Sequence, residues 1–286
     1  MAELRASIVI TTKNRKDDLR TALLSAVRQA GDPEVIVVDD GSDDGTAAMV
    51  RAEFPTVVLH SFPESKGYIV RRNFGASAAT GDIVVSVDDD AEFSTGQTLV
   101  QMLRSFADPR VGAVAMPFVN VKYGPEVHQR DAEGRPRQVE RYIGTAHALR
   151  RDLFLRLGGY REVLFHQGEE SDYCLRMLDA GFIVVLGDSD PILHYESPRR
   201  DFRRMDVYGR RNDVLLGWQN APWAHLPGHQ VRMLARAVVF GLRVRRFPAM
   251  LEGWCKGWGA VLAGRAERRP VSRDAWRLFM RMRYGR

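Results

Sequence analysis

Three consecutive carboxylates, Asp88, Asp89 and Asp90, follow residues 83–87, an apolar run that is typical of a buried strand. Carboxylates two residues apart at a strand end can hold one divalent cation, because Mg²⁺ and Mn²⁺ prefer oxygen ligands and often combine one or two carboxylates with substrate phosphates. An acidic turn that only ends the strand is the alternative. Since three adjacent acids repel one another without a cation, the pattern favours a metal site.

Two other polar clusters could bind parts of a nucleotide. Asp40 follows the apolar run 34–38 and precedes Gly41, which permits a tight turn. Its carboxylate can accept hydrogen bonds from a ribose or a nucleobase, although an Asx turn, with Ser42 capping the next helix, would look the same. Arg71 and Arg72 can neutralise a diphosphate by bidentate hydrogen bonds, or they can belong to a solvated helix face.

The first part of the chain alternates between strand and helix patterns. Strands are predicted over residues 7–11, 34–38, 56–60, 83–87 and 111–116, with helices between them that include 68–79 and 99–106. Continuous apolar strands in such an alternation predict a parallel sheet covered by helices on both faces. Ligands bind beyond the carboxyl ends of such strands, where the polar clusters at 11–15, 39–42 and 88–90 are expected.

The second part of the chain is less regular. We expect a long loop or hairpin over 119–136, a strand within 141–149, a helix over 169–180 that Gly181 ends, and a strand over 182–186. From Phe202 onward the pattern predicts mainly helices, broken near residues 222–227 and at Pro248.

Charge divides the chain unevenly. Residues 199–286 hold 20 Arg and Lys against 6 Asp and Glu, a net charge of +14, which leaves −8 on residues 1–198. An acidic front half suits a metal site, and a basic tail suits an anionic membrane surface or a phosphate-bearing acceptor, although a merely solvated arginine face is an equal alternative. The tail contains no recognisable nucleic-acid module, so we expect no nucleic-acid partner.

The localisation is predicted from features that the sequence lacks. Two distant cysteines, Cys174 and Cys255, make no disulfide framework, so a reducing compartment is expected. The chain shows no secretory signal pattern and no run of 18 apolar residues. We therefore expect a cytoplasmic protein, peripheral on the inner face of the membrane where the basic tail binds it.

Taken together, the motifs resemble family 2 glycosyltransferases. The match runs in order over about residues 6–197, through SIVITTKNR, VIVVDDGSDDGT, SKGYIVRRNFG, ATGDIVVSVDDD, RRDLFLRLGGY and GEESDYCLRMLDAGF. The resemblance implies a GT-A fold, a divalent metal (Mn²⁺ or Mg²⁺) and transfer of a sugar, with inversion, from a nucleotide-sugar to an acceptor hydroxyl of a glycan, a lipid-linked or a small-molecule acceptor. A UDP-sugar is the default donor.

The resemblance also implies roles for individual residues on the donor side. Asp88 and Asp90 form the D-x-D motif, in which Asp90 binds the metal and Asp88 the ribose, and His194 is a candidate further metal ligand. The stretch 144–147 borders the donor sugar. The remaining nucleotide-binding residues are Thr11, Asn14, Arg15, Asp40 at the base, Arg72 near the base or diphosphate, and Asp89 within the acidic motif.

The catalytic base is assigned in the same way. Where this chain has Glu169 and Glu170, the family more often has Glu-Asp, and the second acid is the usual base. Glu170 inherits that role and Glu169 is its rival, while Asp172 and Arg176 fit the motif as structural residues. We accordingly expect a catalytic domain over 1–198, with its nucleotide half at 1–118 and its acceptor half at 119–198, and a basic helical region over 199–286.

Two other functions compete with this interpretation. A sugar nucleotidyltransferase would need a glycine-rich loop after its first strand, and this chain has Thr11-Thr12-Lys13-Asn14-Arg15 there. A non-catalytic nucleotide-binding scaffold would not need Asp88, Asp90 and Glu170 together.

Overall fold

The structure is a computed structural model that describes residues 4–130, 137–196 and 201–285. The chain forms two compact units, an α/β unit of residues 1–159 and 182–198 and a helical unit of residues 160–181 and 199–286. The chain therefore passes between the units three times, after residues 159, 181 and 198. Each unit is described by itself below, and the functional division at residue 198 remains a prediction.

The α/β unit is built on an eight-stranded sheet in the order β3-β2-β1-β4-β10-β6-β11-β9. Its first half is parallel, as predicted: β3 (Val58–Ser61), β2 (Glu34–Asp39), β1 (Ala6–Thr12) and β4 (Ile83–Asp88) run in the same direction. Thr11 lies in register with both Val38 and Asp88. The polar residues that follow these strands consequently begin at one level along the same sheet edge.

The second half of the sheet departs from the parallel pattern. β10 (Ala146–Arg150) runs antiparallel between β4 and β6 (Val111–Ala115), while β11 (Ile183–Leu186) is parallel to β6 and antiparallel to β9 (Gln138–Val139). Because β10 is antiparallel, the residues that enter it lie at the carboxyl end of β4. The amide of Asp88 donates to the carbonyl of Thr145 there, at 3.0 Å.

A second, four-stranded sheet lies next to the acidic turn. Its order is β5 (Ala91–Phe93), β12 (Ile192–His194), β7 (Phe118–Asn120) and β8 (Val127–His128), and β7 with β8 forms a hairpin inside the predicted 119–136 segment, of which 131–136 lies outside the described residues. In this sheet His194 is in register with Ala91 on one side and Asn120 on the other. The sheet thus brings His194 to the residue that follows Asp90.

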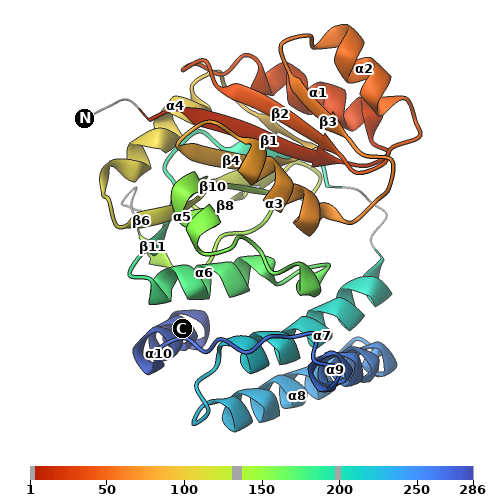
Figure 1. Cartoon of the computed structure of the whole chain (residues 1–286), viewed down its shortest axis with the longest axis vertical. Helices are drawn as coiled ribbons and strands as arrows, with labels where there is room; N and C mark the ends of the chain where they lie inside the picture. The colour runs from red at the N-terminus through yellow and green to blue at the C-terminus, as the bar shows by residue number, and fades with distance from the viewer. Residues whose placement is uncertain (1–3, 131–136, 197–200, 286) are drawn as a thin grey trace. The chain divides into compact units, whose positions relative to one another are not determined.

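Helices cover both faces of the large sheet (Figure 1). Buried side chains of α1 (Lys16–Ala26), α2 (Thr46–Glu53) and α4 (Thr98–Leu103) share a core with alternate strand residues such as Ile8 and Ile10. On the other face, α3 (Tyr68–Ala78) packs so closely that a Cβ on Gly75 would run into Val9. The short helix α5 (Arg151–Arg156) follows β10, and a 3₁₀ turn (Arg104–Ala107) extends α4.

The expected capping of α2 by Ser42 is wrong. The helix begins at Thr46, after Gly45 in the left-handed region (φ 85°). Asp44 supplies the local hydrogen bonds, because its carboxylate accepts from the amide and the hydroxyl of Thr46 at 3.0 and 2.5 Å. The hydroxyl of Ser42 instead accepts from the amide of Asn14, at 2.9 Å. The loop between β2 and α2 is thus longer than the sequence pattern suggested.

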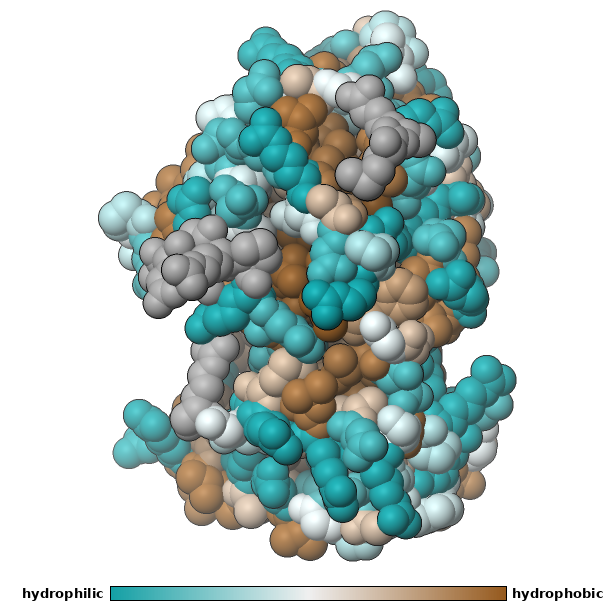
Figure 2. Space-filling view, turned by 90° about the vertical axis from the view of Figure 1, so that its left-hand side faces the viewer, coloured by the Kyte–Doolittle hydropathy of each residue, from teal (hydrophilic) through white to brown (hydrophobic). Residues whose placement is uncertain are grey.

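The helical unit contains α6 (Glu169–Asp179), α7 (Phe202–Asn220), α8 (Leu226–Arg243), α9 (Phe247–Leu262) and α10 (Arg273–Tyr284), with a 3₁₀ turn (Glu162–Leu164) before α6. The predicted break at 222–227 is found between α7 and α8, and Pro248 lies in the first turn of α9. In the lower part of Figure 2, the surface of this unit shows hydrophilic and apolar residues side by side. In the described part of the chain no helix is long and apolar enough to span a membrane.

A buried ion-pair network holds α6 within this unit. The carboxylate of Asp172 accepts from Arg161 at 2.7 Å, from Arg176 at 3.0 Å and from the side-chain amide of Asn220 at 2.8 Å. Asp172 is fully buried, so its charge must be balanced inside the protein, and the arginines do this. Cys174, on the same helix, is buried and Cys255 is exposed, and both are free.

Glycines allow α9 to pack against α7 at close range. A Cβ on Gly253 would run into the backbone carbonyl of Val207, and one on Gly257 would lie 2.9 Å from the carbonyl of Arg211. A backbone carbonyl cannot turn away as a flexible side chain can. Gly259, on the same helix, has open space around it and is exposed.

These contacts predict opposite effects for two alanine substitutions on one helix. Gly253→Ala should lower the free energy of unfolding by about 1–3 kcal/mol through overpacking, whereas Gly259→Ala should leave it unchanged or raise it by up to about 1 kcal/mol through helix propensity. Urea unfolding followed by tryptophan fluorescence measures this directly, since all tryptophans of the chain lie between residues 218 and 276. Equal stability of the two variants would contradict the described packing of α7 on α9.

Candidate functional site

The acidic turn after β4 is bound to the loop after β1. The hydroxyl of Thr12 donates to Asp89 at 2.8 Å, and Nη1 of Arg15 donates to both Asp89, at 3.1 Å, and Asp90, at 2.7 Å. Asp89 and Asp90 are buried and Arg15 is half-buried. Charge-assisted hydrogen bonds of this kind fix the direction of the carboxylates as well as their charge.

His194 approaches the same turn from the second sheet. Its Nε2 lies 3.3 Å from Oδ1 of Asp90, and its Nδ1 is 2.7 Å from the side-chain oxygen of Asn120. The Asn120 oxygen can accept a hydrogen from Nδ1, so Nε2 is the ring atom that faces the carboxylates. Ligand atoms of Asp88, Asp90 and His194 all lie within 4.8 Å of one another.

Asp88 forms an ion pair with a different arginine, Arg72. Nη2 of Arg72 donates to Oδ1 of Asp88 at 2.7 Å and to the carbonyl of Gly144 at 3.1 Å. Arg72 is buried, while the side chain of Asp88 keeps 29% of its surface exposed. The resemblance placed Gly144 beside the donor sugar, and the structure brings it next to Arg72 and Asp88 at this sheet edge.

Burial and mutual repulsion separate the pKa values of the three acids. Burial raises the pKa of Asp88 to about 6, with Arg72 opposing the shift and Asp90 adding to it. Burial also raises the pKa of Asp89 to about 7 against the effect of Arg15 and Thr12. For Asp90 burial acts in the same sense, but the hydrogen bond with His194 and the charge of Arg15 outweigh it and lower the pKa to about 2.

The residues present fit a divalent cation. Two carboxylates and one imidazole form a donor set that suits Mn²⁺ at least as well as Mg²⁺, since imidazole is a better ligand for the later metal. Burial raises the pKa values of Asp88 and Asp89 in spite of the arginines beside them. A bound dication would favour the ionised carboxylates at neutral pH.

Asp40 and Arg71 form a buried pair beside this site. The carboxylate of Asp40 accepts from Nε of Arg71 at 2.6 Å, from the hydroxyl of Ser65 at 2.6 Å, and from the amides of Lys66 and Gly67 at 2.8 and 2.9 Å. Burial would raise the pKa of Asp40, but these donors outweigh it and hold the pKa below its usual value. Asp40 therefore fixes the loop before α3, and its contact with a nucleobase stays a prediction.

Asn14 links two of the loops at the sheet edge. Its backbone is in the left-handed region (φ 54°), and its side-chain oxygen accepts from the amide of Asp43 at 2.9 Å. Thr11 is half-exposed at the end of β1, in register with Asp88. The structure thus collects Thr11, Asn14 and Arg15 with Asp40, Arg72 and Asp88–Asp90 along one edge of the α/β unit, and their contacts with a nucleotide remain predictions.

The two candidate bases begin α6 in the helical unit. Glu169 and Glu170 lie in its first turn, after Gly168, which adopts a left-handed backbone (φ 86°). Glu169 is 1% exposed, whereas Glu170 is half-buried. Both carboxylates interact favourably with the positive end of the helix dipole.

Sequence reasoning missed the residues that orient the others. Asn120 lies 74 positions from His194 and in a segment that we expected to be a loop or hairpin, and Thr12 was part of the polar cluster 11–15 without a role of its own. Arg71 was treated like Arg72, although the structure pairs it with Asp40. The signal for Thr12 was a short polar side chain inside a motif. The sequence around Asn120 carries no such signal.

The mostly parallel sheet carries its acidic group at the carboxyl ends of the strands, where α/β sheets bind their ligands. Residues 7–159 match the model of "Glycosyl transferase family 2", which is more than half of the chain, and the chain belongs to this family.

Characterised relatives share part of this chain. A pre-mycofactocin glycosyltransferase of Mycobacterium tuberculosis (strain H37Rv) is 33% identical over 195 residues, which cover 61% of this chain and 39% of the relative. A glucosyl-dolichyl phosphate glucuronosyltransferase of Haloferax volcanii is 27% identical over 201 residues, covering 62% of this chain and 64% of that protein. The chain spans about two fifths of the length of the first of these relatives.

Solved structures share the GT-A fold. The mannosyltransferase PcManGT from Pyrobaculum calidifontis, in complex with GDP-Man and Mn²⁺, has a TM-score of 0.62 at 22% identity and covers 98% of this chain and 79% of that one. GalNAc-T7 with UDP, GalNAc and Mn²⁺ has a TM-score of 0.57 at 16% identity and covers 75% of this chain and 50% of that one. At these identities the likeness establishes the fold.

The ligand group predicts which acid matters for metal binding. Asp90→Asn should weaken Mn²⁺ binding by roughly 10-fold or more, because loss even of groups behind metal ligands commonly costs 10- to 100-fold. Asp89→Asn is the matched control: Asp89 is adjacent and outside the Asp88–Asp90–His194 group, and an asparagine there can accept from Arg15 through its oxygen and donate to the Thr12 hydroxyl through its NH₂. Electron paramagnetic resonance of free Mn²⁺ measures both affinities. The metal assignment is wrong if both variants bind Mn²⁺ like the wild-type protein.

Proposed function

We propose that this chain transfers a sugar from a nucleoside diphosphate donor to an acceptor hydroxyl, with inversion at the anomeric carbon and with a divalent cation held by Asp88, Asp90 and His194. The observation that carries the proposal is the convergence of these three side chains within 4.8 Å at the carboxyl edge of the sheet, in a chain of glycosyltransferase family 2. Mn²⁺ with a nucleotide or nucleotide-sugar in two structures of the same fold supports the choice of ligands.

On the donor side, we assign Thr11, Asn14 and Asp40 to the nucleoside. The cation, when bound, supplies positive charge to the leaving diphosphate. Arg15 and Arg72 lie against Asp90 and Asp88, so their guanidinium groups are next to the place where phosphate oxygens would meet the cation. Fixed cations that face a leaving group stabilise its developing charge without reorganisation.

The donor can carry uridine, guanosine or thymidine as its nucleoside. UDP is the default by family resemblance, while one structural neighbour holds GDP-Man and another holds UDP. Asp40 is already saturated by protein donors, so its backbone and the loop it fixes are the more accessible groups for recognising a base. We therefore assign recognition of the donor's nucleobase to this loop.

On the acceptor side, Glu170 is the proposed general base. A base must reach an acceptor hydroxyl, and Glu170 retains solvent exposure while Glu169 is almost completely buried. The acceptor itself can be a glycan, a lipid-linked sugar or a small molecule. The net charge of +14 on residues 199–286 supports an anionic partner or surface for this part of the chain.

Calorimetry with nucleotides tests the donor assignment. UDP, GDP and dTDP should be compared with Mn²⁺ present and with EDTA, and one of them should bind at least about 10-fold more tightly with the cation, because a cation held by Asp88, Asp90 and His194 would attract the diphosphate. Asp90→Asn should remove this difference, and Asp89→Asn should keep it. Equal affinity of the wild-type protein for each nucleotide with Mn²⁺ and with EDTA would refute the metal-linked donor site.

Substitution of the two glutamates tests the base assignment. Glu170→Gln preserves size but cannot take a proton, so kcat should fall by roughly 10²- to 10⁴-fold while the donor dissociation constant stays unchanged. Release of nucleoside diphosphate from the donor sugar, with water as the acceptor, gives the rate. Glu169→Gln is the control and should turn over normally.

If Glu169→Gln loses activity instead, Glu169 is the general base. If both variants keep full activity, α6 does not supply the base and the proposed mechanism is wrong. A helix-capping role would appear differently, as about 1 kcal/mol of stability with little change in kcat.

A further inference from the structure

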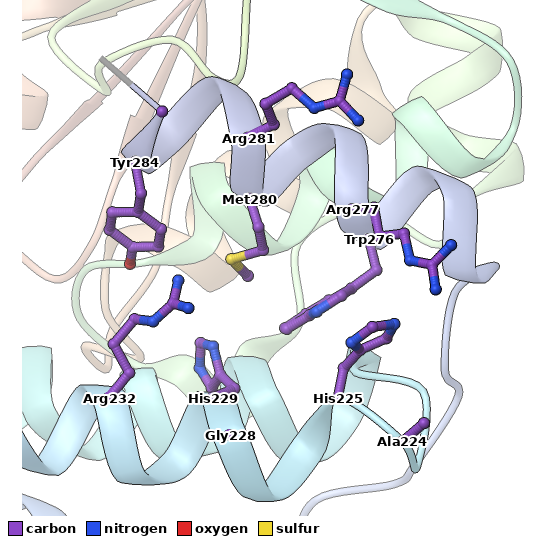
Figure 3. A pocket seen from close by; sticks show the side chains of 11 residues that line it. Ala224, His225, Gly228, His229, Arg232, Trp276, Arg277, Met280, Arg281 and Tyr284 are labelled. Atoms are coloured by element: carbon purple, nitrogen blue, oxygen red, sulfur yellow. The ribbon is translucent and has the colours of Figure 1, made fainter.

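A pocket of about 520 Å³ lies inside the helical unit, between the start of α8 and α10 (Figure 3). Its walls include His225 and Arg232 from α8 and its N-terminal junction, and Trp276 and Arg277 from α10. The ring of Trp276 packs edge-on against His229, at a centroid distance of 5.2 Å, and forms the middle of the wall. The pocket is separate from every residue assigned above to the donor or the base.

The charge that lines this pocket has no counterpart on the protein. No acidic residue lines it, and in the described chain neither Arg232 nor Arg277 forms an ion pair. Some arginines of the same unit pair with carboxylates, as in Arg203–Glu252, Arg210–Asp213, Arg246–Asp206 and Arg269–Glu267, while others, such as Arg243 and Arg265, form no ion pair among the described residues. What sets Arg232 and Arg277 apart is that they line one pocket without an acidic residue, so a bound anion would balance their charge there.

Two further polar groups line the same pocket. Nε2 of His225 is buried and, among the residues described, has no hydrogen-bond partner. Gly228, in the first turn of α8, also lines the pocket, and its amide belongs to the helix start, where unpaired N–H groups and the helix dipole favour an anion. Arginine forks from both helices, together with polar groups at the start of α8, suit an anion with several oxygens better than a single carboxylate.

The rest of the pocket is apolar and larger than one phosphate group needs. Trp276 and Met280 contribute carbon and thioether surface beside the cationic groups (Figure 3). We infer that this pocket binds a phosphate ester, with Arg277 and His225 at the phosphate, Trp276 against the carbon part of the ligand, and Arg232 adding positive charge at the other end of the pocket (Figure 3). This binding site lies beyond the proposed transfer reaction and does not depend on it.

The ester can come from a soluble metabolite or from a lipid head group, and the experiment separates the two. Glycerol phosphate is the soluble probe, titrated with EDTA present and with chloride holding the ionic strength constant. The readout is the indole N–H spectrum of ¹⁵N-labelled protein, in which Trp276 is assigned by Trp276→Phe. Because every tryptophan lies between residues 218 and 276, ligand binding at the donor site is not what this signal reports.

We expect the indole signal of Trp276 to shift with glycerol phosphate. The double variant Arg232→Gln/Arg277→Gln should raise the dissociation constant at least fivefold. The matched control is Arg243→Gln/Arg265→Gln, which removes the same charge from exposed positions of the same unit that do not line this pocket. Unchanged melting temperatures would exclude misfolding as the reason for any loss.

Vesicles give the lipid arm of the experiment. Sedimentation with phosphatidylcholine, alone or mixed with phosphatidic acid, is compared for the wild-type protein and both double variants. Binding to phosphatidic acid that only the pocket variant loses identifies a lipid head group, and glycerol phosphate binding without it identifies a soluble ester. No shift of Trp276 with either probe, or equal weakening by both double variants, would overturn the inference.

Discussion

Repulsion among three neighbouring carboxylates is the constraint around which the α/β unit is arranged. A strand that ends in Asp88, Asp89 and Asp90 places up to three negative charges where water is partly excluded. The fold balances them with groups from separate segments: Arg15 from the loop after β1, Arg72 from α3 and His194 from β12. The balance is incomplete, since burial still raises the pKa values of Asp88 and Asp89 to about 6 and 7. A site of buried carboxylates with converging ligand atoms is one that gains from a dication.

The sheet register and the loop contacts make this balance possible. β1, β2 and β4 end at one level, so their following loops meet without long excursions. Side chains then fasten the loops to one another, Asn14 to residues 42–43 and Asp40 to residues 65–67. A site whose loops are already ordered loses less entropy when a ligand binds. Because several motif residues use their polar atoms in these contacts, fewer of those atoms are free to bind a substrate.

The sequence predicted what depends on local pattern and could not predict what depends on distant pairing. The parallel strands and the acidic turn were readable because apolar runs followed by carboxylates are local signals, and the hydrogen bonds of Asp88 and Asp90 agree with a site there. The antiparallel entry of β10 was not readable, because strand direction is decided by tertiary pairing. The support of His194 by Asn120 depends on a four-stranded sheet whose strands have only two or three residues each. The start of α2 was misplaced because Ser, Asp and Gly in the run 41–45 each permit a turn.

The limit of the family match coincides with a physical boundary. The family model ends at residue 159, and there the chain first leaves the α/β unit for the helical unit. The residues proposed for the donor therefore belong almost entirely to the matched segment, with His194 added by the return of the chain through β11 and β12. The helical unit, by contrast, is organised by its own interactions, namely the buried Asp172 network and the glycine contacts between α7 and α9. Its unpaired arginines cost the fold some self-repulsion that packing alone does not require. Because this charge lies outside the matched segment, we expect selectivity for the acceptor or another anionic partner to reside in this unit and to vary independently of the donor chemistry.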